Sequence, residues 1–320
     1  MLERVKITDF TCESGEKIPA LDLSYEVFGR PLDSGAPVVL VFHALTGNSN
    51  VCGDPNGWWR GLIYPGGTVD TDRYSILCFN IPGNGYDGFL WGDRYARICA
   101  RDIARMFIEA SRRLGVVHFH TLIGGSLGGC LVWEAIAEYP ECAGQAVIVA
   151  GDWKATDWVT ALSVIQLQLL ARGEFGMHDA RMMTMLFFRS PQSIDAKFSR
   201  TMNRELGVRN IQSWLEHHGE KLQGRFSPDA YRFMMHLITT VDISRGRGSF
   251  EQAIRPFAGR IVQVGITSDL YFPAYENVRT QEELMRMRKD AHYLELDTPH
   301  GHDGFLIEFT RMRELLGAFF

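Results

Sequence analysis

Short apolar runs of strand length alternate with amphipathic stretches in the first half of this chain. The runs cover residues 21–28, 37–42, 74–80, 118–123 and 145–150. Between the third and fourth runs, Ile103, Met106 and Phe107 stand at helical spacing, and Gly115 follows as a helix stop signal. This alternation predicts an α/β fold with a mainly parallel central sheet and helices on both of its faces.

The alternation stops after residue 152. Residues 153 to about 250 contain long helical stretches rich in methionine, with no convincing strand before residue 260. Strand patterns resume at residues 261–266 and 291–296, and residues 303–316 are predicted to form a closing helix. We therefore expect a core in two parts, residues 1–152 and 256–320, interrupted by a helical lid insertion at residues 153–255.

Composition and charge indicate which kinds of molecule the protein binds. The chain has 320 residues, of which 46% are hydrophobic, enough for one large core with an insertion. A formal net charge of -5 provides no basic surface, so we expect small-molecule partners and neither nucleic acid nor membrane. The first residues lack the apolar run of a signal peptide, so a cytoplasmic location is expected. The six cysteines lack paired spacing, so no metal site is expected.

A G-x-S-x-G motif at residues 124–128 carries the first chemical signal. It lies between the predicted strand at 118–123 and a predicted helix at 130–139. A sharp strand-to-helix turn of this kind lifts the serine Oγ clear of the backbone, and glycine on either side permits the bend. The alternative is a glycine-rich turn with a capping serine. The order of strand, turn and helix favours Ser126 as a nucleophile.

A nucleophilic serine needs an orienting acid later in the chain. Asp269 lies just beyond the predicted strand at residues 261–266, and functional groups of α/β sheets gather at the carboxyl ends of strands. Asp242 is the competing candidate, but it falls in the predicted insertion. Asp269 is therefore the expected acid.

The base should be a histidine on the loop after the next strand. That loop contains His300 and His302, and spacing alone leaves both open. His292 is a poorer candidate because it lies inside the predicted strand at residues 291–296.

Two backbone amides are expected to form an oxyanion hole. In this arrangement one amide follows the nucleophile and the other comes from the loop after an early strand. Leu127 N–H is the first, and an amide near Leu45 is the second. His43, in the same loop, is predicted to be a buried structural histidine, with proton transfer as the less favoured alternative.

A series of short motifs follows in order along the chain: residues 43–47 (HALTG), 57–63 (GWWRGLI), 70–74 (DTDRY), 124–129 (GGSLGG), 213–216 (SWLE), 265–269 (GITSD) and 301–306 (GHDGFL). Together they resemble the homoserine O-acyltransferases, a homoserine O-acetyltransferase-like family of the α/β-hydrolase superfamily. The resemblance runs from about residue 20 to the end and is far more specific than G-x-S-x-G alone.

The resemblance implies the α/β-hydrolase fold and an acyltransferase activity. An acyl group, acetyl in the first instance, would pass from acyl-CoA to the hydroxyl of homoserine or a similar amino acid through an acyl-enzyme on Ser126. It implies Asp269 as the acid and His302, rather than His300, as the base. Acyl-CoA would be a co-substrate with no bound cofactor, and a homodimer is implied.

Two substrate contacts are also implied by the resemblance. Arg181, in an Ala-Arg-Met segment, would bind the acceptor carboxylate, and Asp303 would bind its ammonium group. A planar guanidinium suits a carboxylate, and a carboxylate suits an ammonium. The alternatives are a surface arginine and an N-cap of the last helix, respectively.

The sequence departs from the family at Phe188, where a tyrosine is usual, and at residues 80–88, where the family has a different loop. Leu127 replaces a usual methionine, a nearly isosteric change. These departures leave the acyl donor and acceptor open. The alternative function is an esterase or related carbonyl-compound hydrolase that uses the same three residues.

Overall fold

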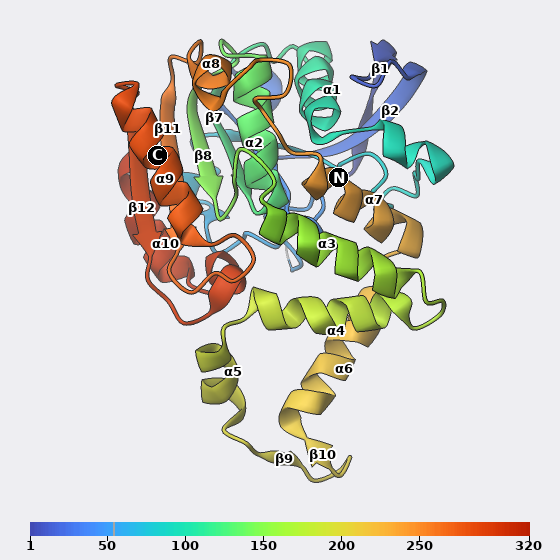
Figure 1. Cartoon of the computed structure of the whole chain (residues 1–320). Coiled ribbons are helices and arrows are strands. Elements are labelled where there is room, and N and C mark those ends of the chain that lie inside the picture. Colours follow the sequence, from blue (N-terminus) through green and yellow to red (C-terminus); the bar gives the residue numbers. More distant parts are fainter. Residues whose placement is uncertain (54) are drawn as a thin grey trace.

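The computed structural model describes residues 1–53 and 55–320, and a twisted sheet forms its centre (Figure 1). The sheet has eight strands in the order β1-β2-β6-β3-β7-β8-β11-β12. The strands β1 and β2 are antiparallel to their neighbours, whereas all pairs from β6 to β12 are parallel. The bounds are β1 (Glu3–Thr11), β2 (Lys17–Gly29), β3 (Val38–Phe42), β6 (Ser75–Phe79), β7 (Phe119–Gly125), β8 (Ala143–Val149), β11 (Arg260–Ile266) and β12 (Ala291–Leu296). This confirms the predicted α/β-hydrolase architecture.

The inner strands were predictable because both of their faces are covered. All five residues of β3 and all five of β6 are buried, so each strand is a continuous apolar run. The edge strand β1 was not predicted. Of its residues only Ile7 and Phe10 are buried, so a mostly polar segment carries little signal.

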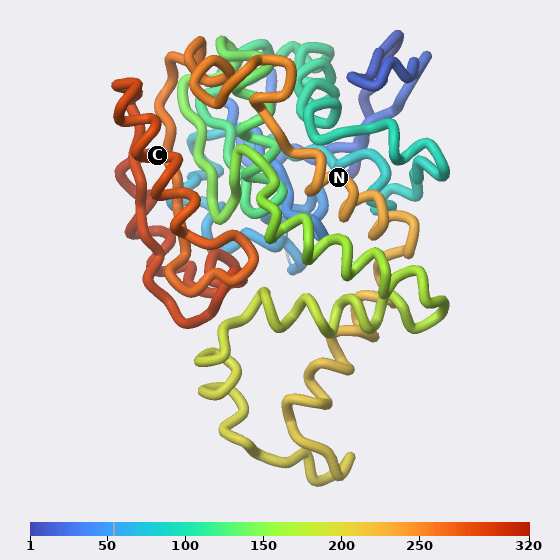
Figure 2. The backbone as a smooth tube through the Cα atoms, in the orientation of Figure 1, coloured from blue at the N-terminus to red at the C-terminus, as the bar shows by residue number. Residues whose placement is uncertain are grey.

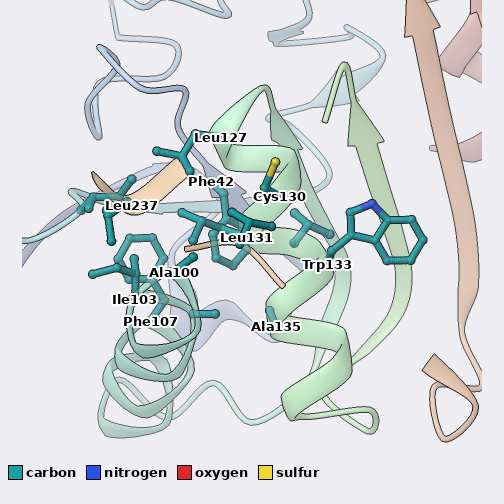
Figure 3. Close-up of a cluster of buried hydrophobic side chains, with 14 of the residues drawn as sticks. Phe42, Ala100, Ile103, Phe107, Leu127, Cys130, Leu131, Trp133, Ala135 and Leu237 are labelled. Atoms are coloured by element: carbon teal, nitrogen blue, oxygen red, sulfur yellow. The ribbon is translucent and has the colours of Figure 1, made fainter. Parts of the chain in front are cut away.

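Helices cover both faces of the sheet. The helices α1 (Ala100–Arg113) and α2 (Leu127–Glu138) pack on one face, where Phe42 and Phe107 stack (Figure 3). The helix α10 (Phe309–Leu316) buries Met312 and Leu316 in a second cluster that includes the alternate residues of β3. The helix α9 (Ala274–Arg286) joins β11 to β12. The remaining short elements are β4 (Ile63–Tyr64), β5 (Val69–Asp70) and 3-10 turns at Leu32–Ser34, Gly92–Arg97, Gly301–Leu306 and Gly317–Phe319.

The predicted closing helix at residues 303–316 is wrong in its first half. A 3-10 turn occupies Gly301–Leu306, and α10 begins only at Phe309. In a 3-10 turn, residues three apart lie on the same side. His302 and Phe305 both point inward, with their ring centroids 5.6 Å apart. Both side chains are buried on that side of the turn.

A mainly helical segment lies between β8 and β11, in the region of the expected insertion. Its elements are α3 (Asp157–Leu170), α4 (Gly176–Phe188), α5 (Pro191–Phe198), β9 (Met202–Asn203), β10 (Val208–Arg209), α6 (Asn210–Gln223), α7 (Pro228–Thr239) and α8 (Phe250–Ile254). The segment from α5 to α6 projects away from the sheet (Figures 1 and 2). The two-residue strands β9 and β10 were not predicted. The helix α8 returns to the core, where the Phe250 and Trp133 rings are 5.9 Å apart.

Residues 154–155 and residues 241–242, two segments of this part of the chain, are held side by side. Ala155 N–H donates to Val241 O at 3.0 Å, and Lys154 pairs with Asp242 at 3.0 Å. In the core below, Arg101 forms a buried ion pair with Glu134 at 3.2 Å and donates to Asp242 O at 2.9 Å. A buried charge needs such partners, so this cluster fixes the base of the insertion on α1 and α2.

In the part of the chain that the structure describes, none of the helices combines the length and apolar character needed to cross a membrane.

Candidate active site

Ser126 occupies the turn between β7 and α2 with a strained backbone. Its φ of 58° and ψ of -128° lie in a region that residues with a side chain rarely adopt. A Cβ on Gly124 would meet the backbone of Gly128 and Gly129, and a Cβ on Gly128 would lie 2.8 Å from the Phe42 carbonyl carbon. Both glycines are therefore required for the bend, as the motif predicted.

The Ser126 hydroxyl is hydrogen bonded to a histidine, and that histidine is hydrogen bonded in turn to an aspartate. His302 Nε2 lies 2.9 Å from Ser126 Oγ, and His302 Nδ1 lies 2.7 Å from Asp269 Oδ2. Asp269 Oδ1 also accepts the N–H groups of Tyr271 and Phe272 at 2.7 and 2.8 Å. Because the aspartate oxygen accepts from Nδ1–H, Nε2 is left as the acceptor for the serine hydroxyl.

The competing candidates lie elsewhere. Asp242 bonds to Ser244 and Lys154, and His292 contacts Asp290 on the outer edge of the sheet. His300 Nδ1 is 3.0 Å from Ser193 Oγ of α5, so it contacts the insertion and not the serine. Among the candidate acids and bases, therefore, only Asp269 and His302 lie at Ser126.

Ser268 is a residue that the sequence analysis did not single out. Its Oγ donates to Thr298 O at 2.5 Å and accepts from Gly301 N–H at 2.9 Å. These two bonds join the loop after β11 to the loop after β12. They hold Asp269 and His302 in register, and no spacing signal could have indicated them.

Aromatic rings enclose the His302 imidazole. Phe188, from the end of α4, stacks on it at 5.3 Å with an interplanar angle of 30°. Tyr271, Phe272 and Phe305 lie at centroid distances of 5.4, 5.6 and 5.6 Å. The imidazole is only 3% exposed, so bulk water is largely excluded from the serine and its neighbour.

Two amides without acceptors flank the turn. Leu127 begins α2, so its N–H has no carbonyl partner within the helix. Leu45 follows β3, and no acceptor for its N–H is found among residues 1–53 and 55–320. Gly128 lets the carbonyls of Phe42 and His43 approach the first turn of α2, which brings the Leu45 loop beside the serine.

His43 is buried and fully bonded. Its Nδ1–H donates to Ala44 O at 2.7 Å, and Nε2 accepts from Ile81 N–H at 2.9 Å. Burial lowers the pKa of His43 to about 4, so the ring is neutral at pH 7. The predicted structural role of this histidine is confirmed.

A pocket of about 350 Å³ lies next to this site: Asp303, the neighbour of His302 in sequence, lines it, whereas Ser126 and His302 themselves do not. It lies between the loop after β3, the helices α4 and α6, and the turn that holds His302. Its lining comprises Ala44, Thr46, Gly47, Asn48, Asn56, Trp58, Arg181, Met185, Arg189, His218, Arg225, Asp303, Leu306 and Ile307. Its volume falls in the range of small-molecule sites.

Arg181 and Asp303 both line this pocket. The Arg181 guanidinium lies 5.2 Å from the centroid of the Phe188 ring, so it is anchored close to the imidazole. Burial raises the pKa of Asp303, and the positive charge of Arg181 opposes that rise. The N-cap alternative for Asp303 is wrong, because Glu308 precedes α10.

Comparison with known proteins supports this assignment of the fold. The family model described as alpha/beta hydrolase fold matches residues 37–308. Proteins named homoserine O-acetyltransferase from Carboxydothermus hydrogenoformans and Symbiobacterium thermophilum are 30% and 32% identical. The alignments cover 99% and 96% of this chain, and 94% and 90% of those proteins.

Solved structures agree. The homoserine O-acetyltransferase of Staphylococcus aureus is 28% identical with a TM-score of 0.84, over 100% of this chain and 94% of that one. Esterase E22 shares the fold with a TM-score of 0.84 at 18% identity, over 99% of this chain and 100% of that one. With a family model that matches residues 37–308 and relatives at least 30% identical over nearly the whole chain, the chain belongs to the homoserine O-acetyltransferase family of the α/β-hydrolase superfamily.

Proposed function

We propose that this protein transfers an acyl group, acetyl in the first instance, from acyl-CoA to the hydroxyl of homoserine or a similar amino acid. The observation that carries the proposal is the pair of 2.9 and 2.7 Å contacts linking Ser126, His302 and Asp269, next to a pocket lined by Arg181 and Asp303. Relatives that are about 30% identical over nearly the whole chain are named homoserine O-acetyltransferase.

In the first half-reaction, His302 Nε2 takes the proton of Ser126 as Oγ attacks the thioester carbonyl. The oxyanion that forms accepts hydrogen bonds from the N–H groups of Leu45 and Leu127. The C–S bond then breaks, and the imidazolium returns its proton to the departing CoA thiolate. Asp269 holds the ring and stabilises its transient positive charge. The product is an acyl-enzyme with the ester on Ser126.

In the second half-reaction, the acceptor replaces CoA. Its carboxylate binds the Arg181 guanidinium, and its ammonium group binds the Asp303 carboxylate. His302 takes the proton from the acceptor hydroxyl as its oxygen attacks the ester carbonyl. The bond between the acyl carbon and Ser126 Oγ then breaks, and the imidazolium returns the proton to Oγ. The insertion at residues 153–255 acts as a lid over the core formed by residues 1–152 and 256–320. It supplies Phe188 and Arg181, and thereby excludes water and positions the hydroxyl.

The proposal includes a setting for the reaction. Acyl-CoA serves as co-substrate with no bound cofactor, the partners are small molecules, and the enzyme acts as a homodimer in the cytoplasm. The family resemblance supports the acyl-CoA co-substrate and the dimer, and the net charge of -5 supports small-molecule partners. Size-exclusion chromatography with light scattering tests the dimer, since a monomer at micromolar concentration would contradict it.

The test of the activity is release of CoA from acetyl-CoA with and without L-homoserine, with the ester product identified by mass spectrometry. We expect CoA release to depend on the acceptor and to vanish in Ser126→Ala. A Ser126→Ala protein should keep its thermal midpoint, which separates loss of the nucleophile from loss of the fold. CoA release that is the same without the acceptor would contradict acyl transfer.

A hydrolase is the second candidate, and Phe188 is the observation that favours it. This residue stands on the imidazole where relatives usually have a tyrosine, so one hydroxyl near the acceptor is missing. If water is the natural acceptor, the acyl-enzyme should hydrolyse as fast with saturating L-homoserine as without it.

A further inference from the structure

The pocket beside Ser126 carries more positive charge than an amino acid acceptor requires. Of its described lining residues, three are arginines, Arg181, Arg189 and Arg225, and one is a carboxylate, Asp303. His218 adds no charge at neutral pH, because burial lowers its pKa to about 4, helped by nearby Arg181. An amino acid has one carboxylate and one ammonium group. It would use Arg181 and Asp303 and leave two arginines.

The two remaining arginines differ in how far they are already engaged. Arg189 donates to Ser193 Oγ through Nε at 3.2 Å and through Nη2 at 2.7 Å, so it joins α4 to α5. Arg225 follows α6 and is exposed, and its Nη1 donates to Thr46 O at 3.1 Å. The rest of its guanidinium fork has no acceptor among the described residues. Arg225 is therefore the arginine of the pocket that is available to a ligand.

The position of Arg225 suits an anion at the pocket mouth. Burial of part of the side chain against the pocket wall, and then the positive charge of Arg181, lower the pKa of Arg225, so its cationic form has no counter-charge there. An anion would supply that counter-charge. A guanidinium binds phosphate through two parallel hydrogen bonds, and these are stronger than bonds between neutral groups.

We propose that Arg225 binds a phosphate group of the acyl-CoA donor at the rim of the pocket. This inference rests on the proposed function. In acyl-CoA a long flexible arm separates the thioester from the phosphates, so the phosphates stay at the rim when the thioester reaches Ser126. Arg225 is thus a donor-specificity residue, distinct from Arg181, which serves the acceptor.

A simpler role for Arg225 would be to support the loop that carries Leu45. Its bond to Thr46 O touches that loop one residue away. Such a role would affect every acyl donor equally, because the oxyanion forms with all of them. A phosphate contact affects only donors that contain phosphate.

The experiment compares Arg225→Gln with the wild-type enzyme on acetyl-CoA and on S-acetyl-N-acetylcysteamine, which has the same thioester and no phosphate. We expect kcat/KM for acetyl-CoA to fall by about ten-fold or more, the range for a hydrogen bond to a charged group. For the phosphate-free donor, kcat/KM of the variant should stay within about two-fold of the wild-type value, and so should kcat/KM for L-homoserine. Higher ionic strength should lower the wild-type value for acetyl-CoA more than that of the variant.

Arg172→Gln is the matched control, because Arg172 is an exposed arginine of the same insertion that lies outside the pocket lining. This variant removes the same charge and should leave kcat/KM unchanged for both donors. Equal loss with both donors in Arg225→Gln would overturn the proposal and assign Arg225 to the Leu45 loop. With succinyl-CoA as a third donor, a loss of kcat/KM confined to that donor would overturn the proposal and indicate that Arg225 binds a carboxylate of the acyl group. If wild-type enzyme forms no acyl-enzyme with either donor, the proposed function itself fails.

Discussion

Gly128 offers the sharpest test of how the turn and the oxyanion loop depend on each other. In Gly128→Ala, the new Cβ would lie 2.8 Å from the Phe42 carbonyl carbon and 2.9 Å from His43 O, and closer still to Phe42 O. All three are backbone atoms, which cannot turn aside as a flexible side chain can. The end of β3 must therefore move away from α2.

The size of this movement follows from ordinary contact distances. Non-bonded carbon atoms are most stable about 3.5–4.0 Å apart, so the two backbones must separate by roughly 1 Å. That shift moves Leu45 N–H relative to Ser126 and Leu127 N–H. Misplacement on this scale lowers rates by about 100-fold. Overpacking of a core contact also destabilises a protein by about 1–3 kcal/mol, partly offset by the better helix propensity of alanine.

The assay measures both quantities in the same preparations. Pre-steady-state release of CoA gives the rate of acyl-enzyme formation, and urea titration gives the free energy of unfolding. Gly144→Ala in β8 is the control, since its Cβ would meet nothing closer than His120 O at 3.5 Å. We expect the control to match the wild-type acylation rate within about two-fold, because no backbone needs to move.

Acylation by Gly128→Ala at the wild-type rate would refute the reasoning. It would mean that the loop after β3 does not contribute to the oxyanion site, or that the turn tolerates displacement. Reduced stability with unchanged acylation would lead to the same conclusion.

Three further predictions concern other parts of the molecule. Arg181→Met should raise the KM for L-homoserine at least about ten-fold while the acylation burst keeps its rate, whereas equal loss in both would indicate a structural role. Burial raises the pKa of Asp152 to about 7, so the folded state binds its proton more tightly than the unfolded chain. Wild type should therefore lose stability relative to Asp152→Asn as the pH rises from about 4 to about 7, by at most about 4 kcal/mol in denaturant titrations, and parallel curves would contradict this. Glu134→Gln should lower the free energy of unfolding by about 2 kcal/mol, because it removes one of the two carboxylates paired with buried Arg101 and leaves Glu13 as the other. Glu251→Gln, in an exposed pair, should lower it by less than about 1 kcal/mol, and equal effects would refute the anchoring role.

The sequence carried much of the fold because the central strands are buried on both faces. A short, continuous apolar run such as residues 38–42 predicts a strand that is buried on both faces. The G-x-S-x-G turn identified the strand and the helix on either side of it. Prediction failed where burial depends on a distant neighbour. The edge strand β1 is half polar, and the helix expected at residues 303–316 is broken by the inward turn of His302 and Phe305.

For the candidate site, the types of catalytic residue were predictable from the sequence, but which side chains pair with one another was not. Spacing could not decide between His300 and His302, because the decision depends on where α5 places Ser193. The same is true of Ser268, whose two bonds join loops about 30 residues apart. Arg225 had no signal at all, since its place at the pocket exists only once α6 is packed against α4.

The pairing of residues 154–155 with residues 241–242 has a consequence for how such proteins diversify. Between Ala155 and Val241 the chain leaves the core and returns to nearly the same point, and the Arg101 cluster lies below that junction. A stretch that starts and finishes at one place can be lengthened, shortened or exchanged for that of a relative while β7, β11 and the loops after them keep their positions. Chimaeras joined there would keep Ser126, Asp269, His302 and Asp303 from one parent and take the counterparts of Phe188 and Arg181 from the other.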